Sequence, residues 1–461
     1  MGPPPLSAVG PARPAPRSLK LEASARALWA IAVPIILAEL SETIVEATDT
    51  AFLGRFGTLE LAAVGLGAAI YEVTVFLTFG LADGIQIVAA RRAGQERPQA
   101  VGDAFFHGAS LLVATSIAVL LFLLLGAQHV TAWLIRSDAV RAGVNAYVGI
   151  LAYAAVFHCL NMAYSALYVG IGRTRLLIGA TLALALTNVV CDYLLIFGHA
   201  GLPRLGLRGA AFGSLLAEMT GFLYFTVGAV AAGDAGRFGL FRRRTLDRKL
   251  TRLMLTIAWP AALERLLGTG RWFAFFVILE RLGEAPLAVA NVVHALYALL
   301  LLPVGGLAEA VCTTVSNLLG QARDAQVGAL VRRTAKWALL VVLPIVALVL
   351  VAPGVPLAVF TADPDLLRRG AGCLRVLALA IVVVIPAELV LGAVMGTGDT
   401  RSTLAIELVL TVVMLASAYS AGPLLGLPLE VVWASEIVGW VACLGLSYAW
   451  LNSERWKRVA I

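Results

Sequence analysis

Charged residues are scarce in this sequence. Asp, Glu, Lys and Arg make up 14% of the 461 residues, whereas the apolar types make up 60%. Soluble domains carry about a quarter charged residues, so a water-facing globular protein is excluded. The mean hydropathy of +0.90 indicates that most of the chain lies in a membrane.

Cysteine and histidine are also rare, and neither occurs at a ligand spacing. Five cysteines stand singly in apolar stretches without a CxxC pair, which predicts small buried side chains rather than disulfides or a metal centre. His107, His158 and His294 lie in or near apolar segments, where packing or hydrogen bonding is expected. No nucleotide-binding loop and no Ser, His and Asp triad order is present, so we expect no enzyme activity and no cofactor.

Apolar runs long enough to cross a bilayer recur along the chain. A spanning helix needs about 20 mostly apolar residues. Twelve segments meet this requirement: 27–53, 60–90, 101–126, 142–169, 176–198, 208–232, 251–280, 286–319, 329–352, 370–396, 402–422 and 430–451. The predicted fold is therefore an all-α membrane protein of twelve transmembrane helices.

Basic residues are concentrated in alternate loops. They gather in the N-terminal segment, in "ARRAGQERP", "GRTR", "GRFGLFRRRTLDRKL", "ARDAQVGALVRRTAK" and "GDTR", and in the terminal "SERWKR". Positive loops stay in the cytoplasm, so both termini are predicted to be cytoplasmic in an inner (cell) membrane. The basic charge is thus a topology signal, and no nucleic-acid partner is expected.

The loops also divide the chain into predicted regions. Residues 1–25 are rich in Pro, Ala and Arg and are expected to form a disordered cytoplasmic tail rather than a signal peptide. Residues 26–232 would form a first lobe and 251–452 a second. A basic cytoplasmic linker at 233–250 and a short tail at 453–461 complete the division.

The two halves repeat each other at an offset of 226 residues. "IAVPIILAEL" at 31–40 matches "IAWPAALERL" at 257–266, and "GRTR" at 172–175 matches "GDTR" at 398–401. Each half has six spans, so both halves enter the membrane in the same direction. Parallel repeats with a central site are typical of alternating-access transporters.

An acidic stripe interrupts the first span. Glu39, Glu42, Glu46 and Asp49 are spaced by 3, 4 and 3 residues, which places them within an arc of roughly 80° on a helix. On a lipid-facing surface each ionised carboxylate would cost about 3 kcal/mol. The stripe must therefore face protein or a water-filled cavity, and we expect that cavity to favour cations.

A second polar group lies in span 5, where Asn188 and Asp192 are four residues apart and share one helix face. At the repeat offset, these two residues correspond to Met414 and Ala418, and Asp49 corresponds to Phe275. The polar group is therefore specific to the first half, which favours a functional role. In contrast, Asp83 and Glu309 occur at equivalent positions in both halves, which favours a structural role.

The chain resembles the multidrug and toxic compound extrusion (MATE) transporters. The resemblance rests on "WAIAVPIILAEL", "ATDTAFLGRFGTLELAAVGLG", "GLADG", "GIGRTR", "TNVVCDYLLIFG", "GLRGAAFGSLLAE" and "MGTGDTR", in this order over residues 27–450. It implies two six-helix lobes in a V shape. The absence of a span 10 carboxylate at Val384 favours the DinF-like branch, although Glu264 and Glu388 offer second-lobe charge.

The resemblance also implies roles for individual residues. Asp49, Asn188 and Asp192 match the first-lobe site that binds a proton or Na⁺, and Ser214 supplies the hydroxyl that often completes it. Pro34 matches the proline at which the first span bends. Tyr147 is a candidate cavity residue on span 4, together with the stripe residues Glu39, Glu42 and Glu46.

The resulting functional prediction is a secondary antiporter. It would export cationic, amphipathic drugs or metabolites in exchange for H⁺ or Na⁺, as a monomer within the lipid bilayer. The alternative is a lipid-linked precursor flippase of the same superfamily, which would require a cationic cavity. Glu218, Glu407 and Glu436 are candidates for interlobe polar contacts.

Overall fold

The computed structural model describes residues 18–360, 363–458 and 461, and over these ranges the chain is helical without a strand. The first six spans are helices α1 (Ala25–Phe56), α2 (Thr58–Gly94), α3 (Pro98–Leu121), α5 (Asp138–Gly170), α6 (Arg175–Phe197) and α7 (Leu207–Ala231). A π-helical turn, η1 (Phe122–Gly126), and the short α4 (Ala127–Leu134) follow α3, and α8 (Asp234–Phe238) lies in the linker.

The second half repeats this order. Its spans are α9 (Arg248–Glu280), α10 (Glu284–Gly320), α11 (Val327–Val351), α13 (Pro364–Gly396), α14 (Thr400–Tyr419) and α16 (Ser435–Asn452). The short elements are η2 (Asp324–Gln326), α12 (Gly354–Leu357), η3 (Ser420–Leu424), α15 (Leu429–Trp433) and η4 (Arg455–Arg458).

The twelve predicted spans each coincide with a helix, so the predicted fold class is confirmed. Eleven helical segments in the described part of the chain are long and apolar enough to cross a membrane. The twelfth is α9, which has 33 residues but carries Glu264, Arg265 and Arg271 near its middle. Polar residues of this kind are tolerated in a span only where they meet protein or water.

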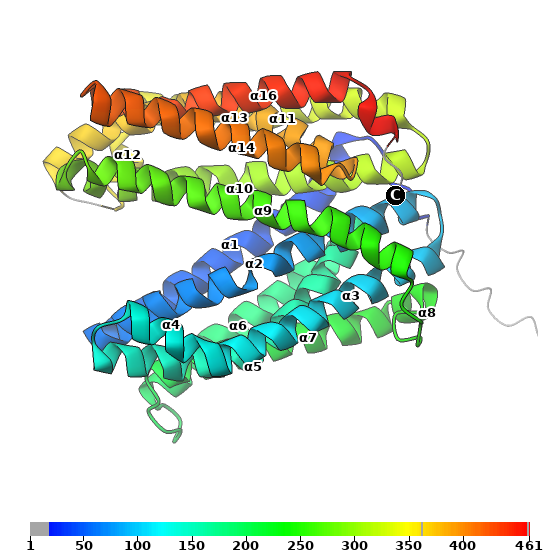
Figure 1. The fold of residues 1–461 in the computed structure, drawn as a ribbon, viewed down its shortest axis with the longest axis horizontal. Helices are drawn as coiled ribbons and strands as arrows, with labels where there is room; N and C mark the ends of the chain where they lie inside the picture. The colour runs from blue at the N-terminus through cyan, green and yellow to red at the C-terminus, as the bar shows by residue number, and fades with distance from the viewer. Residues whose placement is uncertain (1–17, 361–362, 459–460) are drawn as a thin grey trace, which may run out of the picture.

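The spans form two lobes that meet at one end of the molecule. Figure 1 shows α1–α7 and α9–α16 as two groups that converge near α8 and the C-terminus and diverge toward the opposite end. Across the meeting zone, α2 packs on α9 and α10, and α1 packs on α10. Glycine permits the close approach of α2, because a Cβ at Gly80 would lie 2.3 Å from the Ala258 carbonyl oxygen.

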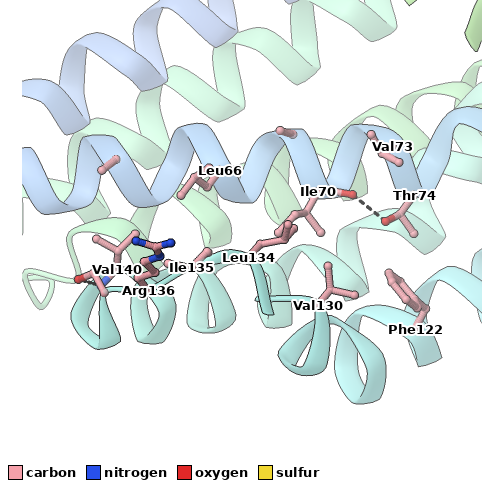
Figure 2. A pocket seen from close by; sticks show the side chains of 13 residues that line it. Leu66, Ile70, Val73, Thr74, Phe122, Val130, Leu134, Ile135, Arg136 and Val140 are labelled. Carbon is pink, nitrogen blue, oxygen red and sulfur yellow. Dashed lines mark hydrogen bonds between the residues drawn. The ribbon is translucent and has the colours of Figure 1, made fainter. Parts of the chain in front are cut away.

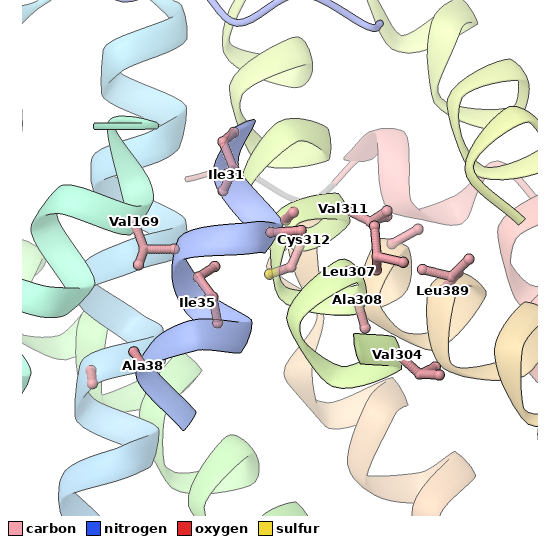
Figure 3. Close-up of a cluster of buried hydrophobic side chains, with 14 of the residues drawn as sticks. Ile31, Ile35, Ala38, Val169, Val304, Leu307, Ala308, Val311, Cys312 and Leu389 are labelled. Carbon is pink, nitrogen blue, oxygen red and sulfur yellow. The ribbon is translucent and has the colours of Figure 1, made fainter. Parts of the chain in front are cut away.

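An apolar core fills the zone between the lobes. Ile31, Ile35 and Ala38 of α1 are buried, as are Leu307 and Val311 of α10. Figure 3 shows these side chains gathered where the two helices run past one another. Burying them stabilises the state in which the lobes are in contact at this end.

In each lobe a threonine hydroxyl donates a hydrogen bond to a backbone carbonyl near the proline of the first helix, α1 or α9. Because Pro34 has no N–H, the carbonyl of Ala30, four residues earlier, loses its helical donor. The Thr174 hydroxyl donates to this carbonyl oxygen at 3.0 Å. In the second lobe the Thr400 hydroxyl also donates near the proline, at 2.8 Å, but its acceptor is the carbonyl oxygen of Ile257 and not that of Thr256, the residue four before Pro260.

The prediction of a disordered tail over residues 1–25 is wrong for its last part. Residues 1–17 lie outside the described ranges, but Leu19 is buried against the helices. The Leu21 N–H donates to Asn317 Oδ1 at 2.9 Å, and Lys20 pairs with Glu96 at 2.9 Å. Hydrogen bonds from Lys20 and Ser18 also hold the pKa of the exposed Glu96 carboxyl below its ordinary value.

The basic linker is folded against the first lobe. Arg244 donates to Asp103 of α3 at 2.5 Å, and Phe238 is fully buried. Asp234, also buried, pairs with Arg173 at the end of α5. The linker therefore lies beside the loop ends of α3 and α5, at the same end as the C-terminal η4.

Candidate functional site

Two aspartates from different helices face each other inside the first lobe. Asp192 of α6 is fully buried, and Asn188, one turn earlier, is 1% exposed. Asp49 of α1 is half-buried and lies close enough to Asp192 for their carboxyl groups to interact directly. The packing of α1 on α6 brings together the three residues that are predicted to bind the coupling ion.

This polar group is short of hydrogen-bond donors. With both aspartates ionised, both carboxylate oxygens of Asp192, Oδ1 of Asp49 and Oδ1 of Asn188 are buried without a hydrogen-bond donor. A proton on one aspartate would let the two carboxyl groups hydrogen-bond to each other. Buried acceptors are almost always satisfied, because leaving one unpaired costs about 1–3 kcal/mol. A proton shared by the aspartates or a hard cation would satisfy these four oxygens, which is the role predicted for them.

Gly213, rather than Ser214, is the residue of α7 that closely approaches Asp192. A Cβ at Gly213 would lie 1.8 Å from Asp192 Oδ1, so any larger residue would displace the carboxylate. Ser214 is the next residue and is half-buried. In the structure as described, its hydroxyl makes no hydrogen bond to either aspartate, and its part in ion binding stays a prediction.

Tyr147 of α5 lies beside the aspartate pair. The residue is 4% exposed, and its hydroxyl is within electrostatic reach of Asp49, Asp192 and Glu46. Its ring packs on the backbone of α2, where a Cβ at Gly67 would lie 2.7 Å from Cδ1 of Tyr147. Tyr147 thus belongs to the surroundings of the aspartate pair, and its contact with substrate stays a prediction.

The other stripe residues of α1 each meet a different group. Glu46 lies near Glu72 and Asp49, and its side chain is exposed. Glu42 is also exposed and lies near His158 and Glu218. Glu39 lies near Arg265 and Glu309 of the second lobe. The acidic stripe therefore runs from the aspartate pair to the meeting zone of the lobes.

Arg265 of α9 forms an ion pair between the lobes. Its Nε and Nη2 donate to the two carboxylate oxygens of Asp83 at 3.2 and 3.1 Å, and Nη2 lies 4.0 Å from Glu309 Oε2. Asp83 and Glu309, which the repeat pairs as structural residues, thus share one arginine. This ion pair connects α2 of the first lobe to α9 and α10 of the second.

The second lobe contains a buried polar network that was not predicted from the comparison of the two halves of the sequence. Arg271 donates to Glu407 at 2.5 Å, and Glu436 accepts from Tyr297 at 3.1 Å and from Trp440 at 3.0 Å. Because these groups are buried within the lobe, assigning Glu407 and Glu436 to interlobe contacts is wrong. The sequence feature that could have revealed this network is the presence of isolated charged residues inside apolar spans.

The repeat partners of Asp49, Asn188 and Asp192 are apolar. Phe275, Met414 and Ala418 are all fully buried. The polar groups of the second lobe instead lie at other levels along the same helices, with Arg271 one turn before Phe275 on α9 and Glu407 two turns before Met414 on α14. Both halves therefore contain buried polar residues, but at positions that do not correspond to each other in the repeat.

A separate groove opens on the first lobe. It has a volume of about 750 Å³ and lies between α2, η1, α4 and the start of α5, lined mostly by apolar residues such as Leu66, Ile70 and Phe122. Figure 2 shows these side chains converging from the two sides. None of the predicted site residues lines this groove.

Comparison with known proteins identifies the family. The MatE family model matches residues 34–194 and 260–420, two stretches displaced by the 226 residues of the internal repeat. The match covers well over half of the chain, so the protein belongs to the MatE family. It is therefore a multi-pass membrane protein of a transporter family, and the repeat offset read from the sequence is confirmed.

Individual relatives cover nearly the whole chain. A probable multidrug resistance protein NorM from Synechocystis is 23% identical, over 93% of this chain and 94% of its own length. A probable NorM from Thermotoga maritima is 21% identical over similar shares, 94% and 93%. A crystal structure of MATE in the bent conformation superimposes with a TM-score of 0.86 at 19% identity, covering 93% of this chain and 95% of its own. The fold is thus shared, while the DinF-like branch stays a prediction.

Proposed function

We propose that the protein exports cationic, amphipathic organic compounds in exchange for H⁺ or Na⁺. Its membership of the MatE family supports this proposal, as do relatives that are multidrug resistance proteins. The two converging lobes suit a transporter that exposes a central site to one side of the membrane at a time.

One observation carries the proposal, namely the four orphaned oxygens around Asp49, Asn188 and Asp192. Two carboxylates facing each other in a low-dielectric site repel, and a bound proton or cation relieves the repulsion. Asn188 contributes a neutral oxygen, a ligand type that suits a hard cation such as Na⁺. A Na⁺ ion would be held by the carboxylates of Asp49 and Asp192 together with the amide oxygen of Asn188.

The ion site is well placed to act on the arrangement of the lobes. Asp49 lies on α1, the helix that also carries Pro34 and packs against α10 of the other lobe. Neutralising Asp49 removes repulsion between α1 and α6, which favours a different position of the outer half of α1. Differential binding of this kind is what a two-state transporter requires.

The substrate class follows from the charge of the exposed stripe. Glu42 and Glu46 of α1 are exposed, and their carboxylates would attract organic cations. A lipid-linked precursor flippase would need free cationic groups for pyrophosphate, but Arg265 and Arg271 are both paired with carboxylates. The antiporter is therefore the better-supported function.

The test is gradient-driven ethidium transport by reconstituted vesicles, with a proton gradient, a Na⁺ gradient or neither. Asp49→Asn and Asp192→Asn should each abolish coupled transport while leaving the folded protein intact. Met414→Leu, at the repeat partner of Asn188, is the matched control and should transport normally. Full gradient-driven transport by Asp49→Asn would overturn the proposal.

A further inference from the structure

A second polar group of the first lobe lies near Glu42, about two turns of α1 from Asp49, and the proposed coupling does not use it. His158 of α5 and Glu218 of α7 are joined through Nδ1 and Oε1 at 3.0 Å. Asn161 donates from Nδ2 to Oε2 of the same carboxylate at 2.6 Å and to its backbone oxygen at 2.9 Å. Glu218 is therefore held in place by two side chains of α5.

The imidazole is enclosed by acidic and aromatic groups. Glu42 of α1 and Glu218 of α7 are the charged groups whose fields act on it. From α2, the rings of Tyr71 and Phe79 meet the imidazole edge-on, with centroids 6.4 and 6.5 Å away. On its own helix the neighbouring groups are Cys159 and Asn161. His158 Nε2 is buried without a hydrogen-bond partner.

This arrangement has a simple charge balance. With His158 protonated, one imidazolium lies between the carboxylates of Glu42 and Glu218 and neutralises one of them. With His158 neutral, both carboxylates are left without a cation in an environment partly lined by aromatic rings. Such a site attracts another cation, and aromatic faces favour organic ones.

We propose that His158 is a protonatable internal cation that competes with cationic substrate for the carboxylates of Glu42 and Glu218. Binding of the substrate releases the imidazolium proton to water, so one positive charge replaces another. Both Glu42 and the His158–Glu218 pair are reachable, because Glu42 is exposed and the pair retains 21% and 18% side-chain exposure. The inference rests on the proposed export of organic cations and adds a proton site apart from the aspartates.

Linkage gives the proposal a measurable consequence. If one proton must leave for each cation that binds, the dissociation constant rises about tenfold for each pH unit below the point at which the site protonates. Any proton released from the aspartate pair adds its own slope. Removing His158 should therefore lower the number of protons released per ethidium bound by one. The protons released by the aspartates should remain.

The experiment measures ethidium binding to the purified full chain between pH 5 and pH 8, together with proton release in weak buffer. For His158→Gln, the slope of the logarithm of the dissociation constant against pH should be smaller in magnitude by one. His158→Lys, with a fixed positive charge, should bind ethidium at least tenfold more weakly than wild type at pH 8. His129→Gln, at an exposed site, is the control and should behave as wild type. Thermal unfolding checks that each variant is folded.

Two outcomes would overturn the inference. One is an unchanged pH slope in folded His158→Gln, and the other is wild-type affinity in His158→Lys. If His158 were only structural, Gln and Lys would weaken binding alike and without a change of slope. Because binding is measured without a gradient, failure here is distinct from failure of the aspartates to couple transport.

Discussion

The hydroxyl of Thr174 donates a 3.0 Å hydrogen bond to the Ala30 carbonyl oxygen, which Pro34 leaves without a helical donor. Thr174 comes from "GRTR", the loop motif between α5 and α6, and this bond fixes that loop to the leading helix of the lobe. The motif repeats as "GDTR", where the Thr400 hydroxyl donates to the Ile257 carbonyl oxygen, one residue after the carbonyl that Pro260 leaves without a helical donor. The repeat thus preserves the contact between the loop motif and the leading helix, whereas the carbonyl freed by the proline is the acceptor in the first lobe but not in the second.

Replacing Thr174 by valine should cost about 1 kcal/mol of stability, the usual contribution of one hydrogen bond. It should also lower coupled ethidium transport, because α1 carries Asp49 beyond the proline. Thr400→Val is the matched change in the second lobe, and it should lower the unfolding temperature with little effect on coupling. Equal transport defects in the two variants would show that the contact is only structural.

The buried Arg271–Glu407 pair predicts strongly non-additive mutations. Arg271→Met leaves the Glu407 carboxylate buried and unpaired, which costs about 3–5 kcal/mol. Replacing both residues, as Arg271→Met with Glu407→Gln, removes the uncompensated charge and should recover most of that loss. Thermal unfolding in detergent for the single and double variants measures the coupling, and purely additive effects would contradict an energetic pair.

The close approach at Gly80 predicts that a larger side chain at this position will force the lobes apart. Gly80→Val places side-chain atoms against the backbone of Ala258 and Ala262, so the lobes must separate at this end. Cys312 of α10, only 3% exposed, should then react faster with a thiol reagent in a variant that lacks the other four cysteines. Gly65→Val, on the same helix but facing open space, should leave that rate unchanged.

The predicted topology can be tested at two exposed loops at opposite ends of the molecule. With the native cysteines replaced, Arg243→Cys in the linker should react with a membrane-impermeant reagent only after the cells are opened. Leu202→Cys, between α6 and α7, should react in intact cells. Labelling of Arg243→Cys from outside would reverse the assigned orientation.

Much of the architecture follows from local properties of the sequence. Apolar run length is sufficient to place twelve helices, and the constant offset between the halves is sufficient to define two lobes. The meeting of Asp49 with Asn188 and Asp192 was expected from the family resemblance, and the structure places them together. The helices and the two lobes depend on apolar run length and repeat symmetry, which the sequence carries directly, whereas the meeting of the three residues was implied by the resemblance.

Other contacts depend on helix rotation and on neighbours that are distant in the chain. Glu42 could be assigned to an acidic face, but its neighbours His158 and Glu218 come from α5 and α7. The choice of Gly213 over Ser214 beside Asp192 depends on about 100° of rotation of α7. Arg271 and Glu407 were visible as isolated charges, yet their pairing required the packing of α9 on α14.

The short segment before α1 joins parts of both lobes. Lys20 pairs with Glu96 at the end of α2, while Gln321, after α10, donates to the Leu21 carbonyl oxygen at 3.0 Å. Separating the lobes at this end must break either the contact of the segment with α2 or its contact with the end of α10. A segment outside the bilayer would thus help to set how often the transporter turns over, and a tag fused at residue 18 would alter the rate it was meant to report.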